Sequence, residues 1–130
     1  MTIRHLDRLL APASVAVIGA SDRAGSVGAT VWRNLRAGGF GGPVWAVNPA
    51  RDALDGEPSY ARVSALPQPP DLAVICTPAA TVAPLVAELG AFGTRAAVVL
   101  SAGLTAEQKQ AALDAARPHC LRLLGPNCLG

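Results

Sequence analysis

The stretch from Val15 to Gly28 constrains the fold of this chain more than any other part of its sequence. A continuous apolar run ends at Ile18, a loop with glycines at 19 and 25 follows, and an amphipathic pattern begins at Ser26. This order of strand, loop and helix is typical of a parallel α/β sheet. The first free N–H groups and the positive dipole end of the helix would meet at the loop, which favours binding of a phosphate group.

The glycine spacing of this loop differs from two common phosphate-binding motifs. A dinucleotide-binding Gly-x-Gly-x-x-Gly motif needs a second glycine where this chain has Ser21. A Walker A motif needs Gly-Lys-Ser/Thr, which does not follow Gly19. The longer, polar loop, which includes Arg23, suits a bulkier or differently bent polyphosphate. The alternative is that Gly19 and Gly25 only permit a turn.

The composition indicates a single, well-buried domain. The chain has 130 residues, of which 51% are hydrophobic and 15% are charged, and this excludes a disordered chain. The net charge of +2 is scattered, so nucleic acid is not an expected partner. No segment is long enough to span a membrane. The three cysteines form no Cys-x-x-Cys pair, which indicates reduced thiols and a cytoplasmic protein.

Short apolar runs alternate with helical patterns along the chain. The runs predict strands at 15–19, 43–48, 71–76, 96–101 and 120–124. Helices are expected at 3–10, from Ser26 to Gly38 with Val27, Val31 and Leu35 facing the sheet, from Thr81 with Pro84 in its first turn, from a Thr105–Gln108 capping box to Pro118, and as a short piece at 60–66.

This alternation predicts an α/β fold, a Rossmann-like doubly wound parallel sheet of about five strands with helices on both faces. Right-handed crossovers favour the strand order 3-2-1-4-5. Residues 1–130 are expected to form one domain. Because a loop leaves the fifth strand without a closing helix, we expect this domain to come from the N-terminal part of a longer protein.

Ligands of such a sheet bind beyond the carboxyl ends of the strands. The candidate binding residues share that edge and are Gly19, Ser21, Arg23, Gly25, Ser26, Val27, Gly28, Asn48, Pro49, Arg51, Thr77, Pro78, Ser101, Ala102 and Asn127.

The end of the second strand discriminates between cofactors. Folds that bind NAD usually carry an acidic residue there, whereas this chain has Asn48 and then Arg51. A cation at this place suits a phosphate on the ribose, as in NADP or coenzyme A (CoA). The alternative, which has equal weight, is that Arg51 is a solvated loop charge facing Asp52 or Asp55.

Groups that could carry out catalysis are scarce. His5 precedes the fold, His119 starts the fifth strand away from the ligand edge, and Cys128 has no base nearby in sequence. The sequence contains no paired carboxylates and no metal-ligand spacing. We therefore expect the chain to bind a ligand without reacting by itself.

Several motifs occur in a fixed order along the chain. They are Val-Ile-Gly-Ala-Ser-Asp-Arg-Ala-Gly-Ser-Val-Gly, Val-Asn-Pro, Asp-Leu-Ala-Val-Ile-x-Thr-Pro, Ser-Ala-Gly and Arg-Leu-Leu-Gly-Pro-Asn-Cys-Leu-Gly. From about Leu6 to Gly130, the series resembles the N-terminal CoA-binding domain of nucleoside-diphosphate-forming acyl-CoA synthetases, relatives of the succinyl-CoA synthetase alpha subunit. The same domain begins some bacterial protein acetyltransferases.

The resemblance implies that CoA or acyl-CoA lies along the strand ends. Residues 21–27 would wrap the nucleotide or pyrophosphate, and Arg51 stands where the family often has a lysine near the ribose phosphate. Thr77–Pro78 and Ser101–Ala102 would line the path of the adenine and the pantetheine arm. The phosphohistidine of the synthetases belongs to a following domain, so phosphotransfer is not assigned to this chain.

The function that the resemblance implies is CoA binding within an ADP- or GDP-forming acyl-CoA synthetase, whose other partner is an ATP-grasp domain or subunit. Three alternatives remain at this point. The chain could be the regulatory domain of an acetyltransferase, a stand-alone CoA- or nucleotide-binding protein, or an NAD(P)-binding redox domain.

Overall fold

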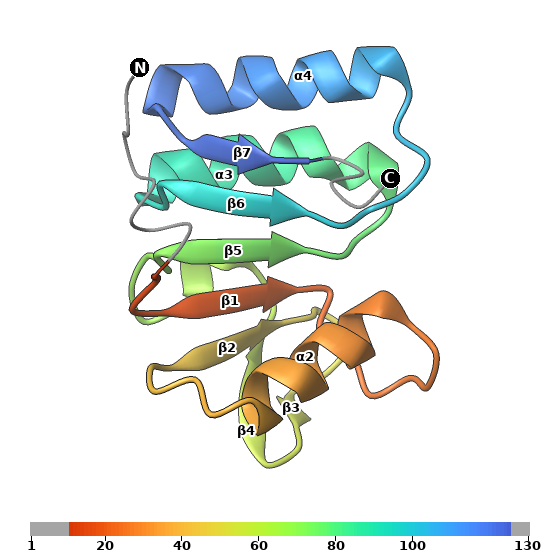
Figure 1. Ribbon diagram of the computed structural model, residues 1–130, viewed down its shortest axis with the longest axis vertical. Coiled ribbons are helices and arrows are strands. Elements are labelled where there is room, and N and C mark those ends of the chain that lie inside the picture. The colour runs from red at the N-terminus through yellow and green to blue at the C-terminus, as the bar shows by residue number, and fades with distance from the viewer. Residues whose placement is uncertain (1–10, 126–130) are drawn as a thin grey trace.

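A computed structural model of the chain describes residues 11–125 (Figure 1). The predicted helix at 3–10 and the candidate Asn127 lie outside this range. In the described part, one sheet has the strand order β3-β4-β2-β1-β5-β6-β7. The strands are β1 (Val15–Ile18), β2 (Val44–Val47), β3 (Ala53–Leu54), β4 (Glu57–Tyr60), β5 (Leu72–Ile75), β6 (Ala96–Val99) and β7 (Arg122–Leu124). All neighbouring strands are parallel except β3 and β4, which form a hairpin.

Helices cover both faces of the sheet, which confirms the doubly wound α/β fold. The helices are α2 (Val27–Ala37), α3 (Val82–Phe92) and α4 (Ala106–Ala116). In β1, Ala16 and Ile18 pack toward α3 and α4, whereas Val17 packs toward α2. The central strands are therefore buried on both sides, and this explains why their sequences are continuously apolar.

The predicted strand order is wrong for the strand at 71–76. This strand, β5, lies beside β1 on the side away from β2, so the five expected strands follow the order 2-1-3-4-5. The position expected for the third strand is occupied by β4, which the sequence analysis does not predict. With β4 counted as third, the six parallel strands have the order 3-2-1-4-5-6.

The β3–β4 hairpin also replaces the start of the short helix expected at 60–66, where only Val63–Ala65 forms a 3-10 helix. Its turn is Asp55–Gly56, with φ angles of 50° and 81°. Two successive positive φ angles are what a type I′ turn requires, and Asp-Gly is a favoured pair for it. Strand β4 contains Pro58 and half-exposed polar residues, which is why it carries no apolar strand pattern.

Helix α2 packs on the sheet through a different face from the one expected. Its buried residues are Gly28, Ala29 and Trp32, whereas Val27 is 51% exposed. Val31 and Leu35 lie at the margin of the contact. The two small residues let the helix approach the sheet closely, and the large Trp32 side chain then fills the remaining space.

Two of the three predicted N-caps are present in the structure. Ser26 caps α2, with its Oγ accepting from the Ala29 N–H at 3.1 Å. The Thr105 capping box of α4 is present in both directions. Thr81 precedes α3 as expected but makes no cap, because its hydroxyl donates to the Pro78 carbonyl instead.

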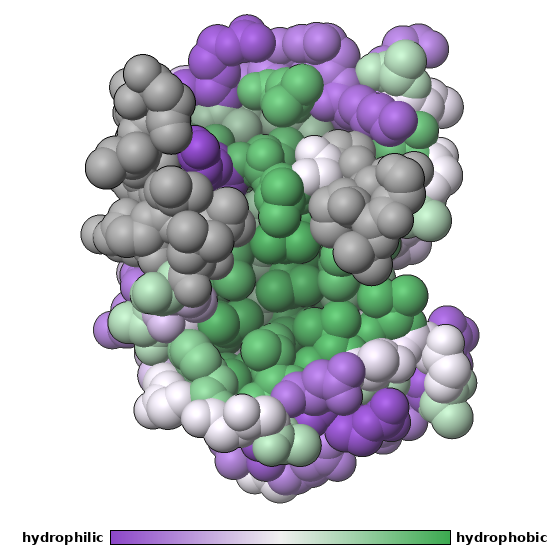
Figure 2. Space-filling model, in the orientation of Figure 1, coloured by the Kyte–Doolittle hydropathy of each residue, from purple (hydrophilic) through white to green (hydrophobic). Residues whose placement is uncertain are grey.

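The face of the sheet that carries α2 is apolar beyond the helix (Figure 2). Leu72 and Val98 are half-buried there, and Leu124 is 46% exposed. Within residues 11–125, no helix combines the length and hydropathy needed to cross a membrane.

Candidate functional site

The strand order of the sheet reverses between β1 and β5. The chain runs from β1 to β2 on one side, and it later returns to place β5 on the other side of β1. The loops after β1 and β5 therefore diverge, and such a point is where ligands of doubly wound sheets bind.

Two glycines bring the backbone close together at the carboxyl edge of the sheet. A Cβ on Gly28 would lie 2.0 Å from the carbonyl oxygen of Gly19, so the start of α2 rests directly on the end of β1. Gly19 has a φ of +94°, and a Cβ there would lie 3.1 Å from the carbonyl oxygen of Cys76. Gly25 has a φ of +85° and open space around it. Gly19 therefore has a packing role besides its turn, whereas Gly25 shows only the backbone angle that a turn requires.

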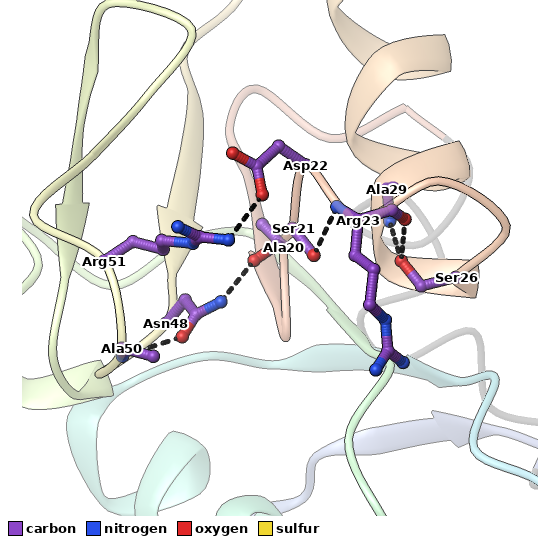
Figure 3. Close-up of polar contacts among 9 residues, drawn as sticks. All are labelled: Ala20, Ser21, Asp22, Arg23, Ser26, Ala29, Asn48, Ala50 and Arg51. Carbon is purple, nitrogen blue, oxygen red and sulfur yellow. Dashed lines mark hydrogen bonds and ion pairs between the residues drawn. The ribbon is translucent and has the colours of Figure 1, made fainter.

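The loop after β1 is stabilised by its own serines (Figure 3). The Ser21 Oγ accepts from the Arg23 N–H at 2.9 Å. The Ser26 hydroxyl donates to the Arg23 carbonyl at 2.9 Å and also caps Ala29. These contacts give the loop a defined shape without using any charged side chain.

The first turn of α2 keeps unpaired N–H groups. Ser26 takes the N–H of Ala29, whereas those of Val27 and Gly28 have no hydrogen-bond partner among residues 11–125. The Arg23 guanidinium also makes no ion pair within this range, and Figure 3 shows its side chain extending without a contact to the other residues drawn. Free amides, a helix N-terminus and a cation are together suited to an anionic group.

Two contacts join the loop after β2 to the loop after β1 (Figure 3). The Asn48 Nδ2 donates to the Ala20 carbonyl at 2.8 Å, and the Arg51 Nη2 donates to the Asp22 Oδ1 at 2.8 Å. The alternative in which Arg51 faces Asp52 or Asp55 is therefore wrong about the partner, which is Asp22. Arg51 instead reaches across to the loop that the sequence predicts as phosphate-binding.

A cavity of about 310 Å³ opens between these strand ends and α3. Four of the predicted residues line it, namely Gly19, Asn48, Pro49 and Thr77. The opposite wall was not predicted from the sequence, and it consists of Ala61, Arg62, Val63, Thr81, Leu85 and Glu88.

Two signals could have found this wall. The Asp55–Gly56 pair marks the hairpin that brings Arg62 and Val63 to the edge. The spacing of Thr81, Leu85 and Glu88 places them on one face of a helix.

The remaining predicted residues lie elsewhere along the edge. Ser21 lines a second cavity of about 230 Å³ on the α2 side, together with Asp22 and Asp55. Ala102 is exposed, whereas Ser101 is 5% exposed and its hydroxyl has no hydrogen-bond partner among the described residues. The structure brings together the residues that follow β1, β2 and β5, and it does not bring Ser101 and Ala102 into the 310 Å³ cavity.

Side chains of reactive residue types can be located among the described residues. Burial raises the pKa of the Cys76 thiol to about 11, so this thiol stays protonated near neutral pH. Residues 11–125 contain no group of His, Cys, Asp and Glu that could hold a metal ion. His119 packs against Gly90 at the opposite edge of the sheet.

Comparison with known proteins shows which family the chain is similar to. A family model described as a CoA binding domain matches residues 13–130. The ADP-forming acetate–CoA ligase I of Archaeoglobus fulgidus is 41% identical over 131 residues, which cover 96% of this chain and 19% of that protein. Trans-feruloyl-CoA synthase of an unknown prokaryotic organism is 41% identical over 133 residues, which cover 98% of this chain and 19% of that protein.

A solved structure extends this likeness to three dimensions. The dinucleotide-forming acetyl-coenzyme A synthetase 1 of Ca. Korarchaeum cryptofilum, in complex with phosphate and ADP, superimposes with a TM-score of 0.89 at 36% identity. The match covers 94% of this chain and 27% of that one. The chain thus spans about a fifth of the length of the curated relatives described above.

The family resemblance predicted from the ordered motifs is confirmed. A CoA-binding family model covers almost the entire chain, and a synthetase of known structure has the same fold and an identical residue at 36% of the aligned positions. This chain therefore belongs to the CoA-binding domain family and is homologous to the N-terminal part of ADP-forming acyl-CoA synthetases.

Proposed function

We propose that this chain holds CoA or acyl-CoA at the carboxyl edge of the sheet for an ADP-forming acyl-CoA synthetase. The observation that carries the proposal is the contact between Gly28 and Gly19, because it places the start of α2 against the end of β1. The unpaired N–H groups of Val27 and Gly28 then face a position that suits the pyrophosphate of CoA.

We assign the parts of the cofactor to four places along the edge. The 310 Å³ cavity, with the apolar side chains of Val63 and Leu85 in its wall, suits the adenine ring. Arg51 would bind the 3′-phosphate of the ribose, and Arg23 would add a cation beside the pyrophosphate. The pantetheine arm would run past Ser101 and Ala102.

The reaction would need parts outside this chain. In an ADP-forming synthetase the phosphohistidine and the ATP-grasp domain lie beyond the CoA-binding domain, so we propose that residues 1–130 form one binding domain of such an assembly. The relatives that match over the same region are CoA ligases, and this favours a synthetase over an acetyltransferase. The free thiols of Cys76 and Cys120 fit a cytoplasmic location.

Calorimetric titration of the 130-residue chain with CoA, dephospho-CoA, NAD and NADP tests this function. We expect CoA to bind more tightly than dephospho-CoA, and we expect Arg51→Ala to remove that preference. The loss should be about 1 to 2 kcal/mol, because one exposed charge-assisted contact is removed.

Arg117→Ala is the matched control, since Arg117 is also exposed and also pairs with an aspartate, Asp114, at 3.2 Å. It should leave CoA binding unchanged. Tight binding of NAD together with indifference to CoA would overturn the proposed function.

A further inference from the structure

Asp22 forms an ion pair with Arg51, the residue that we propose binds the ribose phosphate of CoA. We propose that Asp22 is an internal competitor of that phosphate, which neutralises Arg51 in the free protein and limits the affinity for CoA. This inference rests on the proposed function, because it concerns the same arginine and the same ligand group.

The geometry allows the pair to open without disturbing the loops. The Arg51 Nη2 and the Asp22 Oδ1 are 2.8 Å apart, and the two side chains are 48% and 54% exposed. The separate bond from Asn48 to the Ala20 carbonyl already joins the same two loops and is part-buried. The ion pair is therefore not needed to hold the loops in place, and an incoming anion can replace the carboxylate.

The released carboxylate shares a cavity with another cation. Asp22 lines the 230 Å³ cavity together with Arg33, which makes no ion pair within residues 11–125. The other acid of that cavity, Asp55, accepts a hydrogen bond from the Trp32 Nε1 at 2.9 Å and so has its own partner. After the Arg51 pair opens, Asp22 would thus still line a cavity that contains a positive charge.

Competition makes a specific prediction about ligands. A ligand without the 3′-phosphate leaves the Arg51–Asp22 pair intact, so Asp22 has little influence on its binding. A ligand with this phosphate must displace the carboxylate, and exposed ion pairs of this kind are weak enough to be displaced. Asp22 therefore lowers the affinity for CoA more than the affinity for dephospho-CoA.

The test is calorimetric titration of Asp22→Asn with both ligands at low salt. We expect CoA affinity to rise about threefold to tenfold and dephospho-CoA affinity to rise no more than about twofold, with both gains falling as salt screens the charges. In an Arg51→Gln background, Asp22→Asn should no longer raise the affinity for CoA more than the affinity for dephospho-CoA. Asp114→Asn is the control, because it removes one carboxylate from the exposed Arg117 pair on α4 and should change neither affinity.

The outcomes separate the inference from the proposed function. If the unmodified chain binds CoA but Asp22→Asn weakens CoA or leaves it unchanged, then Asp22 positions Arg51 or is inert, and the inference is overturned while the function stands. If the unmodified chain does not bind CoA, the proposed function fails and the inference fails with it. A gain that persists in the Arg51→Gln background would also overturn the inference, because the effect would not pass through Arg51.

Discussion

The carboxyl and amino edges of the sheet share three structural features but differ in which polar groups remain unpaired. A Cβ on Gly28 at the carboxyl edge and a Cβ on Gly42 at the amino edge would each lie 2.0 Å from a carbonyl oxygen. Each edge also has one buried hydroxyl without a partner among the described residues, on Ser101 and on Thr94 respectively. Each further has an exposed arginine–aspartate pair.

The two edges differ in the hydrogen bonding of the polar groups around these features. At the amino edge, the Ala13 N–H donates to the Asp71 carboxylate and the Asp71 N–H donates to the Ser14 hydroxyl, so the chain closes over the strand starts. At the carboxyl edge, the first N–H groups of α2 have no partner among the described residues, and Gly19, on which α2 rests, lines a cavity. Close packing therefore stabilises both edges, whereas only the carboxyl edge combines it with unpaired N–H groups that a ligand could use.

The largest expected effect comes from Gly28→Ala. Its methyl group would collide with the backbone of β1, so α2 must shift, and we expect stability to fall by about 3 kcal/mol. Because the shift moves the unpaired N–H groups, CoA binding should also be lost. Urea unfolding and calorimetric titration with CoA at a temperature where the variant is folded measure the two effects.

Gly42→Ala is the matched change at the amino edge, since its methyl group would lie 2.0 Å from the Ala13 carbonyl oxygen. It should destabilise the chain to a similar extent and leave CoA affinity unchanged. Equal loss of CoA binding in both variants would contradict the contrast between the edges.

A smaller effect is expected from the two buried hydroxyls. Replacing an unpartnered buried hydroxyl by an apolar group removes a desolvation penalty, so Ser101→Ala and Thr94→Val should each raise stability by about 1 kcal/mol. Thermal or urea unfolding measures this gain. If Ser101 contacts the pantetheine arm, only Ser101→Ala should weaken CoA, and identical CoA affinities in the two variants would argue against that contact.

The smallest effect concerns the two described cysteines. The pKa of Cys76, which is raised to about 11 by burial, means that the folded state holds this proton at a pH where the unfolded chain has lost it. The contribution of this thiol to stability should therefore decline as the pH rises from about 9 to about 11, and Cys76→Ala should remove that decline in urea unfolding.

Alkylation by iodoacetamide at pH 8 provides an independent measurement of the same thiol. Cys76 is half-buried and protonated, whereas Cys120 is exposed near the amino edge, so mass spectrometry should find Cys120 modified first. Equal rates at the two sites would contradict the burial of Cys76.

Much of the architecture follows from short-range patterns. The continuously apolar runs predict the strands from β1 to β7 apart from the hairpin, because central parallel strands are buried on both faces. Ser26 and Thr105 predict the starts of α2 and α4, because a cap forms between residues only three apart. The hairpin is missed because β4 is a polar strand with a proline, and its only marker is the Asp55–Gly56 turn.

The candidate site divides in the same way. Gly19, Asn48, Pro49 and Thr77 could be predicted as lining residues, because each directly follows or closely follows a strand end and all strand ends of a parallel sheet meet at one edge. Arg62 and Glu88 could not, because their place depends on the path of the hairpin and on the docking of α3. The face on which α2 packs was also unpredictable from its leucines and valines, since the size of Trp32 governs that contact.

Local chemistry along the chain thus indicates where strands and helices begin, which turns need glycine, and which candidate ligand-binding residues share one edge of the sheet. These features involve neighbours within a few residues, so no knowledge of the fold is required. The strand order, the wall of the cavity and the pairing of Arg51 with Asp22 come from long-range packing. Asp22 and Arg51 are 29 positions apart, and their meeting depends on β1 and β2 being neighbours, which no local pattern encodes.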